Sequence, residues 1–180
     1  MPVVTHTLLA TSWEAQAFAH GATQFRRPVK PQCGSHTVRC PFGVPGDVVL
    51  VKETWGYWGC DDQGNPRFAY RADGERPGIK WKCSSIMPPV AVRTRRVMTE
   101  VRVERAQAIT EEDARACGVP LQRDNADPTN VAIYPPRVEF RNLWDSRWSK
   151  KGYPWSGEAF CWVVNVRSEL PDCDAGKGGE

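Results

Sequence analysis

Long apolar segments are missing from the 180-residue sequence, in which no stretch approaches the roughly 20 residues that a membrane helix needs. The first residues, Met1 to Trp13, also lack the basic start and the cleavage site of a secretory signal peptide. These two absences predict a soluble, cytoplasmic protein without a membrane partner.

Local motifs of several enzyme classes are missing as well. The sequence contains no GxGxxG, P-loop, HExxH or GxSxG element. Hydrolysis of nucleoside triphosphates, dinucleotide-dependent oxidoreduction and α/β-hydrolase chemistry therefore have no local support, and we expect no cofactor.

Cysteine pairs are absent too, because the seven cysteines are odd in number and scattered along the chain. We expect reduced thiols. Cys33, His36 and Cys40 have a spacing that is plausible for zinc, and Cys60 or Cys83 would have to complete a tetrahedral site. Since no second close pair of ligands accompanies them, we predict that the protein binds no metal.

Acidic residues are absent between Glu14 and Asp47, although the whole chain carries 24 Lys and Arg against 21 Asp and Glu. Six basic or titratable side chains lie in this interval: His20, Arg26, Arg27, Lys30, His36 and Arg39. A segment of one charge sign can collect phosphate groups, and it can equally be a solvated basic surface.

What is present has the balance of a folded domain: 41% hydrophobic residues, 25% charged residues and a mean hydropathy of -0.51. The length fits one domain, which we place at residues 1–168. Residues 120–137 are polar and contain proline, which favours a loop insertion. The glycine-rich, charged residues 169–180 are predicted to be a disordered tail.

Local patterns predict several short strands and a few short helices. We expect a helix from Trp13 to His20, capped by Ser12 and ended by Gly21, and a second helix that begins at Thr110 and stops at Gly118. The other expected elements are a Pro- and Gly-rich connection at 27–46, strands at 48–55, 97–103 and 159–167, a hairpin of 55–58 with 68–70, and a helix at 141–148. Together they predict an α+β, mainly β fold: a small β-barrel or strongly bent sheet with a few short helices packed at its ends.

An ordered series of segments resembles one known family. The series consists of Gly21–Arg27, Cys40–Asp47, Val51–Trp55, Tyr70–Asp73, Ser85–Pro88, Glu104–Arg105, Ile109–Ala114 and Leu143–Ser146. In this order the segments look like the ASCH (activating signal cointegrator homology) family, especially its phage- and prophage-encoded branch, over roughly residues 8–167. The resemblance implies a PUA-like β-barrel with a cleft for RNA, DNA or a nucleoside.

Some small bacterial relatives are amidohydrolases that act on N4-acetylated cytidine, and some are ribonucleases. The amidohydrolase pattern implies a lysine, a threonine and a glutamate where this chain has Ala22, Phe25 and Cys117. Alanine and phenylalanine cannot act as nucleophile, base or oxyanion donor. The resemblance therefore implies binding rather than inherited amide hydrolysis.

Two arginines and three aromatic residues are candidate binding groups. Arg26 and Arg27 match the paired arginines of the family and can contact phosphate or a base edge, unless one of them forms a structural ion pair with Glu53 or Asp73. Three aromatic residues can stack on a base or pack in the core: Trp55, Tyr70 and Trp144.

Glu53 follows an apolar strand, so its carboxylate can accept protons from an exocyclic amine or neutralise Arg27, and it is the first catalytic candidate if there is any catalysis. Asp73 is included in the candidate site. Arg96, with Arg93 and Arg95, can form a phosphate track or a solvated face.

The leading hypothesis is a protein that binds nucleic acid or a nucleotide, including a modified base, without catalysis. The alternatives are an RNA- or nucleoside-processing hydrolase with a rearranged site, in which Glu53, Asp73 and Arg27 hold a metal or position water, and a structural or interaction protein of phages.

Overall fold

The computed structural model describes residues 3–32, 39–119 and 134–168. Its strands and α-helices, in chain order, are β1 (Thr5–Leu9), α1 (Ser12–Ala19), β2 (Gln24–Pro28), β3 (Val48–Lys52), β4 (Trp55–Cys60), β5 (Pro66–Tyr70), β6 (Thr94–Arg105), α2 (Glu111–Ala116), α3 (Pro136–Trp148) and β7 (Phe160–Ser168). None of the helices in these ranges is long and apolar enough to cross a membrane.

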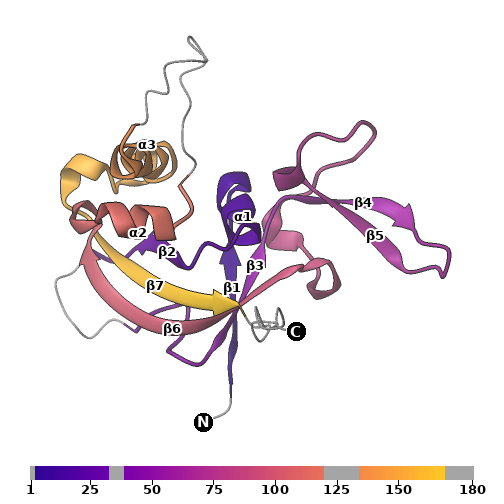
Figure 1. Cartoon of the computed structure of the whole chain (residues 1–180), viewed down its shortest axis with the longest axis horizontal. Helices are drawn as coiled ribbons and strands as arrows, with labels where there is room; N and C mark the ends of the chain where they lie inside the picture. The colour runs from indigo at the N-terminus through magenta and orange to yellow at the C-terminus, as the bar shows by residue number, and fades with distance from the viewer. Residues whose placement is uncertain (1–2, 33–38, 120–133, 169–180) are drawn as a thin grey trace, which may run out of the picture.

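Five strands form one sheet in the order β1-β3-β6-β7-β2, in which β1 and β3 are parallel and the other neighbours antiparallel. The two longest strands, β6 and β7, curve together across the molecule (Figure 1), and their register shifts between Met98 and Glu100. The expected α+β, mainly β class is confirmed. The expected barrel is not found in the described residues, because β1 and β2 lie at opposite ends of the sheet order and do not pair with each other.

Strand β7 is buried on both of its faces. Val164 and Val166 pack in a core with Phe18 and Phe25, which come from α1 and β2. Val163, on the opposite face, packs in a second core that α2 and α3 cover. The alternation that predicted this strand is confirmed, and the apolar character of both faces follows from its position between two helical layers.

Helix boundaries differ from the sequence prediction in two places. Thr11, not Ser12, is the N-cap of α1, because its hydroxyl accepts from the backbone N–H of Glu14 while the Glu14 side chain accepts from that of Thr11. Helix α3 begins at Pro136, not Arg141, since proline suits a first helical position. Part of the predicted 120–137 loop is therefore helical, and residues 120–133 and 169–180 lie outside the described ranges.

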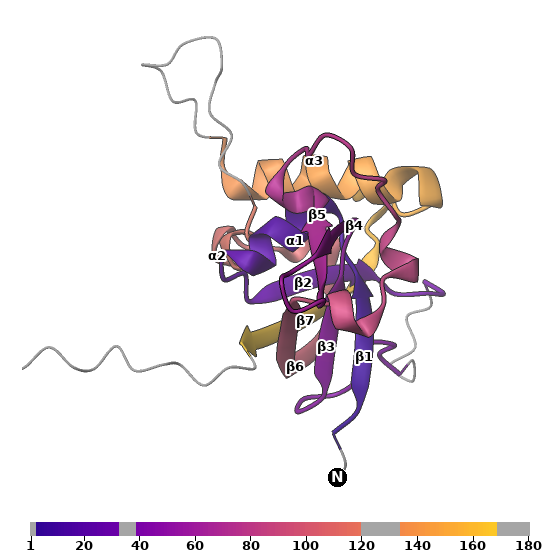
Figure 2. The same ribbon diagram turned by 90° about the vertical axis from the view of Figure 1, so that its right-hand side faces the viewer.

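The helix capped by Thr110 and the strands at β6 and β7 are confirmed. The predicted strand at 48–55 is interrupted, since β3 ends at Lys52 and β4 begins at Trp55. The predicted hairpin is β4–β5, which projects from the side of the molecule opposite α2 and α3 (Figures 1 and 2). Strands β1 and β2 were not predicted.

Candidate functional site

Four cationic side chains surround the indole ring of Trp148, the last residue of α3. The guanidinium carbons of Arg27 and Arg147 lie 5.9 and 4.9 Å from the ring centroid. The ammonium groups of Lys30 and Lys151 lie 5.6 and 4.7 Å from it. These distances are within the range of cation–π attraction. We call these five residues the Trp148 cluster.

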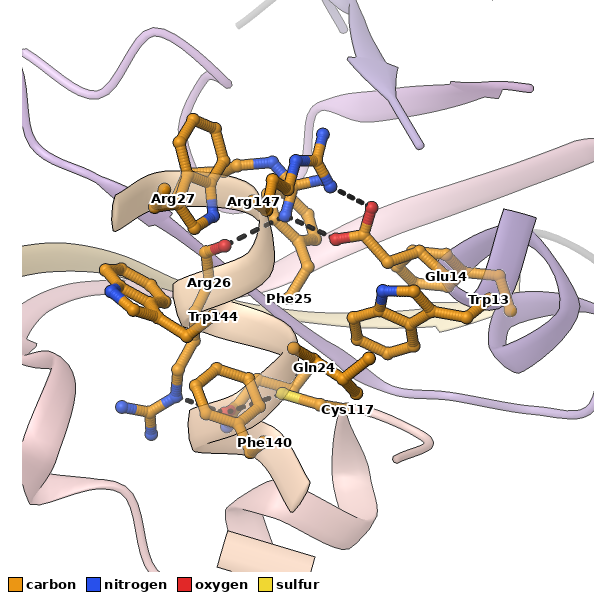
Figure 3. A pocket seen from close by; sticks show the side chains of 13 residues that line it. Trp13, Glu14, Gln24, Phe25, Arg26, Arg27, Cys117, Phe140, Trp144 and Arg147 are labelled. Carbon is orange, nitrogen blue, oxygen red and sulfur yellow. Dashed lines mark hydrogen bonds and ion pairs between the residues drawn. The ribbon is translucent and has the colours of Figure 1, made fainter. Parts of the chain in front are cut away.

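One carboxylate, that of Glu14, partly neutralises the Trp148 cluster. Its Oε1 accepts from Arg27 Nη1 at 2.6 Å, and Arg147 donates to its Oε2 (Figure 3). Burial opposes ionisation of Glu14, but the charges of the two arginines hold its pKa below the usual value. Helix α1 places Glu14 here, because the same side chain completes the Thr11 capping box.

The cluster keeps an excess of positive charge. Among the described residues, Lys30 and Lys151 take part in no ion pair. Four cations against the carboxylate of Glu14 leave a formal excess of three positive charges. Such a concentration of one sign beside a protein wall attracts anions.

An open cleft of about 320 Å³ adjoins the Trp148 cluster. Its lining residues are basic, aromatic or proline: Arg27, Pro28, Lys30, Arg39, Pro41, Phe42, Trp148 and Trp162. Lys30 and Arg39 are exposed at the cleft, whereas Trp148 and Trp162 are buried and present only a small part of their rings. The cleft therefore combines exposed cations with buried aromatic walls. We call it the basic cleft.

A second, much narrower cavity also has Arg27 and Trp148 in its lining. Figure 3 shows the side chains around it. Its volume is about 20 Å³, which is enough for about one water molecule. Phe25 and Cys117 line it, and burial raises the pKa of the Cys117 thiol to about 12. A protonated thiol in a cavity of this size cannot serve as a nucleophile for a nucleoside.

The two arginines predicted from sequence are separated by the pleat of β2. Arg27 lines the basic cleft. Arg26 points to the other side, where its fully buried side chain pairs with Glu104 at 3.1 Å and Asp113 at 2.8 Å. The ion pair considered between an arginine of β2 and Glu53 or Asp73 is not formed, because Arg93 pairs with both carboxylates.

The predicted residues Glu53, Tyr70 and Asp73 do come together, around Arg93 rather than Arg27. The Arg93 guanidinium donates to both oxygens of Glu53 at 2.9 and 3.0 Å and to both oxygens of Asp73 at 2.7 and 2.8 Å. The central carbon of this guanidinium lies 4.0 Å from the centroid of the Tyr70 ring. Burial raises the pKa of Glu53, an effect that Arg93 only partly offsets. The charges of Glu53, Asp73 and Arg93 are therefore paired with one another, and none of these residues lines the basic cleft.

Of the three remaining candidates, Trp55 and Trp144 are buried and Arg96 is partly exposed. Trp144 is 3% exposed and donates its indole N–H to the backbone oxygen of Tyr153 at 2.8 Å. Trp55 is 6% exposed, and its indole N–H has no acceptor among the described residues. Arg96 donates to the backbone oxygen of Phe18 at the end of α1.

The candidate zinc ligands cannot all be located, because Cys33 and His36 lie outside the described ranges. Cys40 is buried, and burial raises its pKa. Cys60 and Cys83 are exposed. Within the described ranges, no group of three His, Cys, Asp or Glu side chains is arranged to hold a metal ion.

Sequence analysis missed most of the Trp148 cluster. Arg147, Trp148 and Lys151 lie within five consecutive residues at the end of α3, and this local density of cations beside tryptophan was the available signal. Phe42 and Trp162 had no such signal, because only the folded chain brings them to the cleft.

The fold and this site define an α+β protein, mainly sheet, with a cationic and aromatic cleft. No family model matches the chain, and no curated protein matches it. Among solved structures it is similar to protein EF3133 from Enterococcus faecalis V583, described as family-model DUF984, with 9% identity, a TM-score of 0.44, and an alignment that covers 98% of this chain and 88% of that chain.

Proposed function

We propose that the protein binds nucleic acid or a nucleotide in the basic cleft and does not transform it. The observation that carries this proposal is the set of four cations around Trp148, with an excess of positive charge, beside an open cleft with aromatic walls. Nucleotides carry an anionic phosphate and a flat base, and these two groups need the two kinds of side chain that the cleft offers.

Some residues of the cleft are suited to contact a phosphate group, and others are suited to contact a base. Lys30 and Arg39 are exposed and take no part in the described ion pairs, so they can follow a phosphate without breaking one of these ion pairs. Phe42 is partly buried against the core and offers a fixed surface to a base. Arg27 is held by Glu14, so it contributes a positive potential at a constant position.

Binding without turnover is favoured over the hydrolase alternative because, within the part of the chain that the structure describes, no suitable base lines this cleft. Glu14 is ionised but accepts from two arginines and from Thr11. Glu53 is held by Arg93 in a different part of the molecule. General base catalysis needs a carboxylate or imidazole that can reach the substrate, and neither glutamate meets this condition.

Membership of the ASCH family, with its PUA-like barrel, remains part of this proposal. The strong curvature of β6 and β7 is compatible with an opened or incomplete barrel of that kind (Figure 1). The ordered sequence segments from Gly21 to Ser146 are the observation that supports it.

The test is a titration of labelled single-stranded RNA, single-stranded DNA and nucleoside monophosphates with the purified protein. Affinity should fall as salt rises from about 50 to about 200 mM, because phosphate binding releases counterions. The double variant Lys30→Ala/Arg39→Ala should lower the dependence of log K on log salt by about 1 to 2.

Arg115→Ala is the matched control, because this side chain is 61% exposed and lies outside the basic cleft. It should leave the affinity of the cleft unchanged. If wild-type protein binds no oligonucleotide and no nucleotide at low salt, the proposed function is wrong.

A further inference from the structure

The hairpin β4–β5 and the segment that follows it form a rigid projection, residues 55–82, which we call the arm (Figures 1 and 2). The Asp61 side chain accepts from the backbone N–H groups of Gln63 and Asn65 at 3.0 and 2.8 Å, which holds the turn. Gly56 permits the close approach of Ile79, since a Cβ at this glycine would lie 2.3 Å from Ile79 Cγ2. The arm is thus held at its tip and along its length.

Trp58 is the most unusual side chain of the arm. The Arg76 guanidinium lies 4.2 Å from the centroid of its ring, yet the residue remains 53% exposed. One side of the indole therefore carries a stacked cation, and much of the ring still faces solvent. A large aromatic residue that is fixed on a rigid strand and open to solvent stabilises the isolated fold very little.

The charges around Trp58 are unevenly compensated. Two of the arm's four acidic residues are engaged, since Asp73 pairs with Arg93 and Glu75 pairs with Arg71. The other two, Asp61 and Asp62, lie at the turn and enter no ion pair of the described residues. Arg67 and Arg76 enter none of the ion pairs of the described residues.

The pairing of the two strands also places a cation close to Trp58. Tyr57 pairs with Phe68, so Arg67 lies opposite the irregular part of β4 that carries Trp58. Two unpaired arginines and an open indole are thus brought together on one part of the arm.

We infer that the arm is a second contact for single-stranded nucleic acid, in which an unpaired base stacks on the open face of Trp58 and neighbouring phosphates pair with Arg67 and Arg76. Stacking on an aromatic side chain accepts any base, and a cation on the opposite face strengthens the arrangement. A duplex keeps its bases stacked internally, so the arm selects single strands. This inference rests on the proposed function and specifies its ligand as a strand that extends beyond one nucleotide.

The test compares wild-type protein with Trp58→Ala and with Arg76→Ala in binding a nucleoside monophosphate, a single strand of about 20 nucleotides and the corresponding duplex. Both substitutions should weaken binding of the single strand by about fivefold or more, the lower end of the loss for one stacked base. Neither should change binding of the monophosphate, which the basic cleft alone holds, and the duplex should respond less than the single strand.

Tyr134→Ala is the matched control, because Tyr134 is an aromatic residue of similar exposure, 54%, outside the arm. It should change none of the three affinities. If both arm variants bind the single strand as wild type does while the monophosphate still binds, the arm inference is overturned and the cleft proposal stands. If wild-type protein binds none of the three ligands, the proposed function fails and this inference fails with it.

Discussion

At the residue scale, Glu14 connects the start of α1 with the Trp148 cluster. Its carboxylate accepts from Thr11, Arg27 and Arg147, which come from three different segments of the chain. A buried carboxylate that is paired in this way leaves two uncompensated arginines when its charge is removed. Glu14 therefore affects both the stability of the protein and the position of Arg27 in the cleft.

Replacement of Glu14 by glutamine should lower the free energy of unfolding by about 3 to 5 kcal/mol at neutral pH, the usual cost of removing one partner of a buried ion pair. The folded-state pKa of Glu14 is depressed, so its contribution is fully present above the ordinary value of 4.5 and is lost as pH falls through the folded-state pKa. The difference between wild type and Glu14→Gln should therefore shrink below pH 4.5. Urea unfolding at a series of pH values measures it.

Glu112→Gln serves as the control, because Glu112 also lies in the first turn of a helix but has a side chain that is 83% exposed. Its unfolding curves should follow those of wild type at every pH. A pH-independent difference for Glu14→Gln would contradict the ionised pairing described above.

At the scale of the elements, strands with a regular alternation of apolar residues were predictable, and β1 and β2, which lack it, were not. The alternating residues of β6 and β7 predicted both strands correctly. Strand β2 contains two arginines and has the sequence pattern of a polar segment, yet all five of its residues are buried. Its burial is possible because Glu104 and Asp113 neutralise Arg26 from positions 78 and 87 residues away.

The contact between α1 and the end of α2 depends on Gly118. This residue has a φ of +70°, and a Cβ on it would lie 2.5 Å from the Cβ of Ala17. Gly118→Ala should therefore lower the free energy of unfolding through both backbone strain and overlap, by about 2 to 4 kcal/mol in total. Urea unfolding of the purified variant measures this loss.

The variant Gly152→Ala separates the cost of backbone strain from the cost of steric overlap. Gly152 has a similar φ of +86°, but no atom lies within 4 Å of its added Cβ. This variant should lose only the cost of strain, about 1 to 2 kcal/mol. If Gly118→Ala and Gly152→Ala lose the same free energy of unfolding, the overlap with Ala17 adds no cost and the packing argument is wrong.

At the scale of the whole molecule, two cavities share Arg27 and Trp148 as lining residues, and their sizes limit the chemistry available there. The wider one has room for a ligand, and none of the described residues that line it is an available base. The narrower one contains Cys117 but has room for about one water molecule. A site that binds a substrate equally well in its ground and transition states does not accelerate its reaction.

N4-acetylcytidine should therefore remain intact when it is incubated with high concentrations of the protein. Chromatography of free cytidine, beside a sample without protein, measures the reaction. Release of cytidine that increases with protein concentration and disappears in the Lys30→Ala/Arg39→Ala variant would contradict the prediction and would place an active site in the basic cleft.

The candidate site was less predictable than the fold. The acid-free segment between Glu14 and Asp47 drew attention to Arg27, Lys30 and Arg39, which line the basic cleft. The sequence could not distinguish Arg26 from Arg27. Both form ion pairs, but the pleat of β2 places Arg26 with Glu104 and Asp113 and places Arg27 with Glu14 beside the cleft.

The sequence by itself determined the α+β class, the cap at Thr110, the hairpin turn at Asp61 and strands β6 and β7, because each depends on residues that are close in the chain. The tertiary structure alone decided the sheet order, the open sheet and the partners of the buried charges. It also decided that Trp148 and Trp162 line one cleft with Arg39. These features depend on which distant segments pack together, and a buried charge takes whichever opposite charge the packed chain brings within reach.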